Sequence, residues 1–298
     1  MVRAHIPDMM PTPTDPRNPS AFASRFADVN GVRLHYVEAG AGAPILFLHG
    51  FPEFWYAWKG QLAEFGRDHR VIALDQRGYN LSDKPQPVAA YALPVLVEDV
   101  RALLDHLGLA RVTLVGHDWG GVVAWAFAMA HAERLERLVI INAPHPAVFR
   151  RELAGNPAQQ EASRYIGTFR TPQAEGLLLA NGCAALERIV LADGLAKGYL
   201  TAEDRTAYLA AWTQPGAMTG GLNWYRAMGA PLPAEYVFAT PTLVIWGMND
   251  TALLPGNLEG LDQWVARLHV ERVPDADHWI VHQRPELVNR LIRDFLVA

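Results

Sequence analysis

The 298-residue chain holds one cysteine, Cys183, so it can form no internal disulfide bond and no cysteine-based zinc site. It also lacks any apolar run of transmembrane length and any cluster of lysine and arginine. Its formal net charge of −5 argues against a nucleic-acid-binding surface. The first 20 residues are rich in proline but lack the apolar stretch of a signal peptide. These features predict a cytoplasmic protein with no membrane or nucleic-acid partner.

Short apolar runs alternate with helix-like segments along most of the chain. Continuous apolar strands separated by helices are typical of a parallel sheet covered on both faces. The predicted strands, after a hairpin at 27–38, are 44–48, 71–74, 111–115, 138–142, 241–246 and 270–273. We therefore expect an α/β fold with a mostly parallel central sheet flanked by helices.

A second unit is predicted where the strand pattern stops. The chain between the fourth and fifth of these strands contains helical segments but no strand-like run: 152–170, 175–190 and 202–212. A helical insertion of this kind covers the carboxyl edge of the sheet, where open α/β sheets bind ligands. The expected organisation is an N-terminal extension (1–25), a core domain (26–146 and 231–298) and a helical cap, or lid, domain (147–230).

The stretch GHDWGG at 116–121 follows the strand 111–115 and precedes an apolar helix. Small residues around a tight strand-to-helix turn are typical of the nucleophile elbow G-x-S-x-G, here with Asp118 in place of the serine. An aspartate that only caps the helix is the alternative, but it leaves the small residues unexplained. A carboxylate suits in-line displacement at saturated carbon, which forms an ester of the enzyme. Asp118 is therefore the predicted nucleophile, and an epoxide or an alkyl halide is the predicted electrophile.

Two further side chains follow predicted strands and complete a catalytic triad. His278 comes after the last strand and is the predicted general base that activates water. Asp250 follows the strand 241–246 and is the predicted carboxylate that orients this imidazole, with a simple turn aspartate as the alternative. The order nucleophile, acid, histidine is that of the α/β-hydrolases. His282 stands four residues after His278, but without further ligands this spacing predicts no metal site, and we expect His282 at the surface.

Backbone amides are expected to stabilise the tetrahedral state formed when the ester is hydrolysed. A loop of four residues, 49–52, follows the strand 44–48, and the amides of Phe51 and Trp119 are the candidate oxyanion donors. A plain Gly-Pro turn is the alternative, and we expect Glu53, the next residue, to be solvated. The pocket is expected to be apolar and aromatic. The predicted substrate-binding residues are His49, Pro52, Trp125, Trp224 and Trp279.

Tyrosines of the predicted cap are candidates for the acid that opens an epoxide. Ring opening leaves an alkoxide that needs a proton, whereas halide departure needs a cradle of weak donors such as an indole N–H. Tyr165 and Tyr225 lie in segments that are expected to overhang the elbow. Packing alone would also account for an aromatic residue at either position.

Taken together, the motifs resemble the epoxide hydrolases of the α/β-hydrolase fold from about Phe26 onward. The matching motifs are HGFPE at 49–53, DQRGY at 75–79, SDKP at 82–85, GHDWG at 116–120, NAPHP at 142–146, NWYR at 223–226 and DHW at 277–279. The resemblance implies no metal or organic cofactor, and it implies these roles: nucleophile Asp118, acid Asp250, base His278 and ring-opening tyrosines Tyr165 and Tyr225. Asn80 departs from the glycine expected after Arg-Gly-Tyr, which concerns the conformation of a loop rather than the chemistry.

Three alternatives are weighed against this hypothesis. Haloalkane dehalogenases share the Asp-Trp pair at the elbow, but they tend to have a polar residue where this chain has Phe51. Fluoroacetate dehalogenases resemble the HGFP loop but have an arginine where this chain has Trp119. A non-catalytic ligand-binding homologue would have no reason to keep Asp118, Asp250 and His278. The favoured prediction is an epoxide hydrolase whose partners are a small epoxide and water. The identity of the epoxide and the formation of a homodimer stay open.

Overall fold

The computed structural model describes residues 22–229 and 237–298. Most of the predicted N-terminal extension and the predicted return from cap to core at residue 231 therefore lie outside the described residues. The first strand begins at Ala23, inside the range predicted for the extension. Within the described ranges, no helix has both the length and the hydropathy that crossing a bilayer requires.

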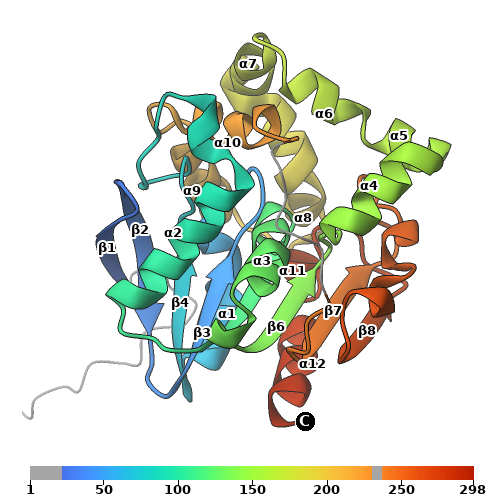
Figure 1. Ribbon diagram of the computed structural model, residues 1–298. Helices are drawn as coiled ribbons and strands as arrows, with labels where there is room; N and C mark the ends of the chain where they lie inside the picture. The colour runs from blue at the N-terminus through green and yellow to red at the C-terminus, as the bar shows by residue number, and fades with distance from the viewer. Residues whose placement is uncertain (1–21, 230–236) are drawn as a thin grey trace, which may run out of the picture.

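An eight-stranded sheet forms the centre of the fold (Figure 1). The strands run in the order β1-β2-β4-β3-β5-β6-β7-β8; β2 pairs antiparallel with β1 and β4, and every other pair is parallel. The strands are β1 (Ala23–Val29), β2 (Val32–Ala39), β3 (Ala43–Leu48), β4 (His69–Leu74), β5 (Val112–His117), β6 (Leu135–Ile141), β7 (Thr242–Gly247) and β8 (Leu268–Val273). The mostly parallel sheet predicted from the apolar runs is confirmed.

The central strands are apolar because helices cover the sheet and keep water from them. In β3, for example, four successive side chains from Ile45 to Leu48 are fully buried. The covering helices form two groups: α2 (Leu93–His106) packs on α3 (Trp119–Ala130), and α1 (Lys59–Phe65) and α11 (Ile280–Gln283) pack on α12 (Pro285–Val297). The parallel strands thus end together at one edge, which is where the predicted site residues follow them.

Helices inserted between β6 and β7 lie over that edge (Figure 1). We call them the cap. They are α4 (Pro146–Gly155), α5 (Pro157–Ala162), α6 (Arg164–Phe169), α7 (Ala174–Leu186), α8 (Ala192–Lys197), α9 (Ala202–Trp212) and α10 (Ala217–Arg226), with a π-helical turn, Glu187–Leu191, between α7 and α8. The prediction for residues 202–212 coincides with α9.

The prediction of one long first cap helix, 152–170, is wrong. The segment forms the end of α4 and the separate helices α5 and α6. Pro157 has no backbone N–H and cannot continue α4, and the Asn156 side chain caps α5 by accepting from amides of its first turn. The second predicted helix, 175–190, is also interrupted, because residues 180–183 leave the helical conformation.

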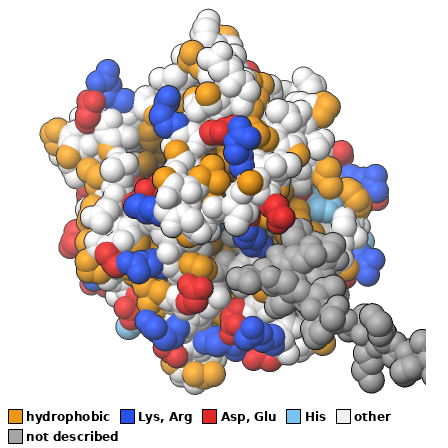
Figure 2. Space-filling model, turned by 180° about the vertical axis from the view of Figure 1, so that it is seen from behind, with side chains coloured by type: hydrophobic (Ala, Val, Ile, Leu, Met, Phe, Trp, Pro, Cys, Tyr) orange, Lys and Arg blue, Asp and Glu red, His pale blue; other side chains and the backbone are white. Residues whose placement is uncertain are grey.

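The surface carries charges of both signs. Figure 2 shows acidic and basic side chains interspersed on the face opposite to the view of Figure 1. Ion pairs at the surface of the molecule include Arg293 with Glu64 at 2.7 Å and with Asp68 at 2.9 Å. Exposed pairs of this kind contribute about 0–1 kcal/mol each, so the fold depends mainly on its buried apolar sheet.

Candidate active site

Asp118 lies at the turn between β5 and α3. Its backbone has φ of 51° and ψ of −122°, a strained conformation for a residue other than glycine. The turn is tight on both sides: a Cβ on Gly120 would lie 2.2 Å from the carbonyl oxygen of Leu48, and a Cβ on Gly50 would lie 2.4 Å from the Cβ of Asp118. Close approach of the backbone therefore accounts for the small residues around the aspartate.

His278 and Asp250 come from the loops after β8 and β7 and meet beside Asp118. Nδ1 of His278 lies 2.7 Å from Oδ2 of Asp250, and Nε2 of His278 lies 3.6 Å from Oδ2 of Asp118. The first distance is that of a hydrogen bond and the second is too long for one. The imidazole therefore faces Asp118 across a gap while its far side is held by Asp250. The structure brings these three predicted side chains together.

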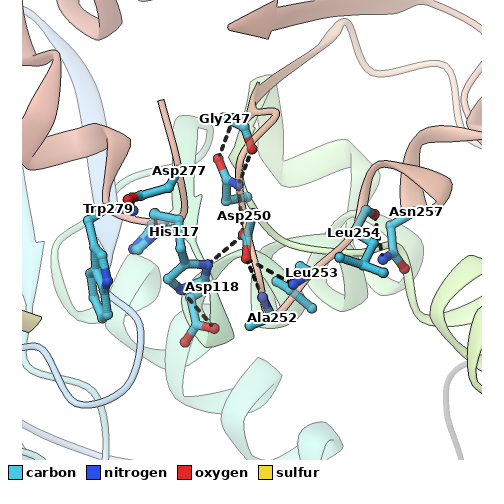
Figure 3. A network of polar contacts seen from close by, with 12 residues as sticks. His117, Asp118, Gly247, Asp250, Ala252, Leu253, Leu254, Asn257, Asp277 and Trp279 are labelled. Atoms are coloured by element: carbon cyan, nitrogen blue, oxygen red, sulfur yellow. Dashed lines mark hydrogen bonds and ion pairs between the residues drawn. The ribbon is translucent and has the colours of Figure 1, made fainter. Parts of the chain in front are cut away.

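Donors surround the Asp250 carboxylate (Figure 3). Oδ1 accepts from the amides of Ala252 and Leu253 at 2.8 and 2.9 Å, and Oδ2 accepts from Nδ2 of Asn142 at 2.8 Å. Burial alone would raise the pKa of Asp250, but His278 and these donors hold it below its usual value. The role of Asn142 was not predicted. Asn142 directly follows β6, which pairs with β7, and this position at the carboxyl edge of the sheet could have indicated a contact with Asp250.

The two candidate oxyanion donors are an amide of the loop after β3 and the amide that directly follows Asp118. The Phe51 amide donates to Oδ1 of Asp118 at 2.8 Å. Trp119 is the first residue of α3, where a backbone amide has no acceptor within its own helix. The Phe51 amide therefore already points at the Asp118 carboxylate, and the Trp119 amide stays a candidate by its place at the start of α3.

The charge of the triad histidine depends on its neighbours. Burial alone would lower the pKa of His278, but the negative charges of Asp250 and Asp118 raise it to about 9. A base that accepts a proton from water must be neutral. The hydrogen bond with Asp250 and the charge of Glu53 also raise this pKa, so loss of the charge on Asp118 removes one of several causes that keep the imidazole protonated.

A cavity of about 660 Å³ lies between Asp118 and the cap. Tyr165 and Tyr225 line it together with Asp118, and their ring centroids are 6.1 Å apart. Tyr225 also stands edge-to-face on Trp119 at 5.2 Å. The rest of the lining is mainly apolar and includes Leu93, Leu96, Val122, Phe149, Leu153, Ile166 and Met228. The lining also includes Arg150 and Tyr91, whose hydroxyl donates to the carbonyl of Pro85 at 2.8 Å. The cavity therefore offers one carboxylate, one guanidinium and the phenols of Tyr165 and Tyr225 in mainly apolar surroundings.

The tryptophans that were predicted to bind the substrate differ in whether they line the cavity. Trp224 lines the cavity, and its indole N–H donates to the carbonyl of Arg77 at 2.9 Å. Trp125 does not line it: this residue is fully buried in α3, and its indole N–H donates to the carbonyl of Ala143 at 3.1 Å. Its ring packs against His145 and Phe238, so it is a core residue.

Three other predicted binding residues lie outside the cavity lining as well. His49 is fully buried, its Nε2 accepts from the amide of Gln76 at 3.1 Å, and burial lowers its pKa. Pro52 lines a separate small void, and Trp279 packs beside the His117 ring. These side chains shape the loops that hold the site rather than the cavity itself.

Two expectations of solvent exposure are wrong, because Glu53 and His282 are both buried. Oε1 of Glu53 lies 2.5 Å from Nε2 of His282, and Oε2 lies 3.1 Å from Nδ1 of His117. Burial alone would raise the pKa of Glu53, but the two histidines hold it well below its usual value. Sequence reasoning missed this cluster because its members lie on three distant segments and follow no periodic pattern.

Asn80 occupies the position where a glycine was expected. Its φ is 40°, in the left-handed region that glycine adopts freely and asparagine tolerates. Its side-chain amide donates to Oδ2 of Asp75 at 2.7 Å. The substitution therefore keeps the backbone conformation of the loop.

The described residues hold no group of three or more His, Cys, Asp or Glu side chains arranged to bind a metal ion. The sheet order, the strained elbow and the Asp–His pair from later strands define an α/β hydrolase with an aspartate where the elbow usually carries serine. A family model of the α/β-hydrolase fold matches residues 43–173.

Comparison with known proteins shows which group of α/β hydrolases this chain is similar to. Epoxide hydrolase 4 of mouse is 38% identical over 90% of this chain and 77% of its own length. An AB hydrolase superfamily protein of Bacillus subtilis, YfhM, is 40% identical over 91% of this chain and 97% of its own. The structure of a Bacillus megaterium epoxide hydrolase in complex with an inhibitor matches with a TM-score of 0.88 and 38% identity, covering 92% of this chain and 100% of that one. The chain belongs to the epoxide hydrolases of the α/β-hydrolase fold.

Proposed function

We propose that this epoxide hydrolase forms a vicinal diol in two steps through an ester on Asp118. The observation that carries the proposal is the position of Asp118, which lies 3.6 Å from His278 and shares its cavity with Tyr165 and Tyr225. Apart from Asp118 and Arg150, the lining carries no charged side chain among the described residues, and this mainly apolar surface favours aryl or alkyl epoxides over highly charged ones. Residues 147–230 act as the cap domain and the remainder of the chain from residue 26 as the core domain, because α4–α10 are inserted between two strands of one sheet.

In the first step, a carboxylate oxygen of Asp118 attacks an epoxide carbon and the ring C–O bond breaks. The alkoxide takes a proton from one of the two tyrosines while the other donates a hydrogen bond. Burial and the charge of Asp118 raise the pKa of both Tyr165 and Tyr225, so both phenols carry their protons in the resting enzyme. The product of this step is a hydroxyalkyl ester and one tyrosinate.

Once the Asp118 charge is lost in the ester, His278 releases its own proton to solvent and becomes neutral. In the second step, the neutral His278 takes a proton from water, and the hydroxide adds to the ester carbonyl carbon. The amides of Phe51 and Trp119 stabilise the resulting oxyanion. The ester C–O bond then breaks, and the leaving alkoxide takes the proton from His278. The proton left on Asp118 restores the tyrosine, so one epoxide and one water give one diol.

Single turnover in ¹⁸O-water tests this route. With enzyme in excess over an aryl epoxide, the diol should be free of ¹⁸O and the label should appear in the peptide that contains Asp118. Direct attack of water on the epoxide would place the label in the diol instead, and would contradict the proposal. A matched alkyl halide serves as a second substrate, and efficient halide release would favour dehalogenase chemistry.

The Tyr225→Phe variant should open the ring about 10- to 100-fold more slowly, because one of two donors to the developing alkoxide is lost. Rapid-quench measurement of ester formation on Asp118 checks this. Tyr199→Phe is the matched control, because the Tyr199 hydroxyl donates to Asp193 and does not line the cavity. Unchanged ester formation in Tyr225→Phe would remove this residue from the mechanism.

Ester hydrolysis should accelerate as pH rises, with an apparent pKa below the value of about 9 that His278 has in the free enzyme. The sign follows from the proposed steps: His278 must be neutral to accept a proton, and esterification removes the Asp118 charge that helps to keep it protonated. Single-turnover hydrolysis against pH, compared with NMR titration of the His278 ring in the free enzyme, measures both values. Equal pKa values in the two states would show that the Asp118 charge has no such influence.

A further inference from the structure

One face of the cap helix α9 carries three buried polar anchors. Asp204, Tyr208 and Trp212 follow each other at intervals of four residues, which places them on the same side of the helix. Tyr208 donates its hydroxyl hydrogen to Oε1 of Glu53 at 2.9 Å, and the Trp212 indole N–H donates to the carbonyl of Pro52 at 2.6 Å. In the core, Asp204 accepts from Tyr56 and Lys59, and its other oxygen accepts from Thr201 at the start of α9. These core partners lie in one segment, residues 52–59. The Tyr208 hydroxyl also lies 3.2 Å from Nε2 of His282, which itself contacts Glu53.

That segment overlaps and continues the loop 49–52, which carries the candidate oxyanion donor Phe51. Phe51, whose amide donates to Asp118, immediately precedes Pro52 and Glu53. The Glu53 amide closes the turn by donating to the carbonyl of Gly50 at 2.9 Å. An anchor on the Pro52 carbonyl and another on the Glu53 side chain therefore fix the orientation of the peptide that carries the Phe51 amide.

Glu53 also connects α9 to the catalytic histidine. Its Oε2 contacts Nδ1 of His117, and Nε2 of His117 lies 2.8 Å from the backbone carbonyl of His278. Because a carbonyl only accepts, Nε2 of His117 donates to it, and Nδ1 of the same ring faces the Glu53 carboxylate at 3.1 Å. The link ends on the backbone of His278 rather than on its ring, so it positions the imidazole and relays no proton to it.

We infer that Tyr208 and Trp212 are positioning residues for the second step of the reaction. Through their contacts with Glu53 and Pro52, they hold the Phe51 amide and the His278 imidazole at the positions from which both groups act on the ester of Asp118. Neither residue lines the substrate cavity. The inference rests on the proposed two-step function, in which the oxyanion amides and His278 act on the ester while Asp118 and the tyrosines of the cavity form it.

The Tyr208→Phe variant tests this assignment, because it keeps the ring and removes only the hydroxyl. We expect ester hydrolysis to slow about tenfold, since small misplacements of oxyanion donor and base are costly. Ester formation should change less than about twofold, so that the ester accumulates in the steady state. Rapid quench followed by the mass of the Asp118 peptide gives both rate constants. Tyr199→Phe, which removes the hydroxyl of a cap tyrosine bound to Asp193, should leave both unchanged.

Trp212→Phe provides an independent variant, and it carries the test if Tyr208→Phe does not fold. It should show the same selective loss of ester hydrolysis. A lower melting temperature with both rate constants at their wild-type values would mean that the anchors only stabilise the fold, and would overturn the assignment. Equal slowing of both steps would also overturn it. Wild-type protein that forms no ester would instead overturn the proposed function itself.

Discussion

The Asp118→Ala variant is expected to lose epoxide turnover by a factor on the order of 10⁵ to 10⁶, the scale seen when a nucleophile of a triad is removed. The cavity lining includes Asp118 but no other carboxylate among the described residues, so no second group there can form the ester. Diol formation from an aryl epoxide, followed by chromatography, measures the loss. Retention of more than about one per cent of wild-type turnover would contradict the nucleophilic role.

Two measurements separate a chemical loss from a structural one in this variant. The melting temperature reports folding, because alanine is placed at a backbone φ of 51° that it adopts at some cost. The pKa of His278 should fall below about 9, since one of the charges that raise it is gone. A folded variant with this lowered pKa and no turnover assigns the loss to the missing carboxylate.

The His278→Gln variant is expected to trap the ester. Glutamine cannot accept a proton from water, so hydrolysis should slow by about 10⁴-fold. Ester formation requires Asp118 and the tyrosines of the cavity, which the variant retains. An aryl epoxide and a matched alkyl halide are offered together, and the mass of the Asp118 peptide is then measured. A hydroxyalkyl adduct is the expected result.

Other outcomes of this experiment are equally informative. A plain alkyl adduct would identify halide displacement as the favoured chemistry. No adduct, together with no turnover by the wild type, would favour a ligand-binding protein. The double variant with Asp118→Ala is the control, because any mass that persists in it comes from another residue.

Much of the site was predictable because its signals are local. Small residues within four positions of Asp118 indicate the elbow in the sequence. Small residues are needed there because the backbone passes within contact distance of Leu48 and Gly50. Asp250 and His278 each follow a strand, and parallel strands bring their carboxyl ends to one edge. Several of the predicted pocket residues do not line the cavity. No local feature of the sequence distinguishes Trp224, which lines the cavity, from Trp125, which lies in the core.

The sequence alone predicted a carboxylate at the elbow, the chain order of Asp118, Asp250 and His278, and the strand pattern of the sheet, because these depend on residue chemistry and on near neighbours. Burial, pKa and hydrogen-bond partners were decided by tertiary structure. Glu53 looks like a loop carboxylate in the chain, yet Tyr208 and His282 enclose it from segments more than 150 residues away. Water is removed from such a group only when distant segments pack around it, and no local pattern records which segments those are.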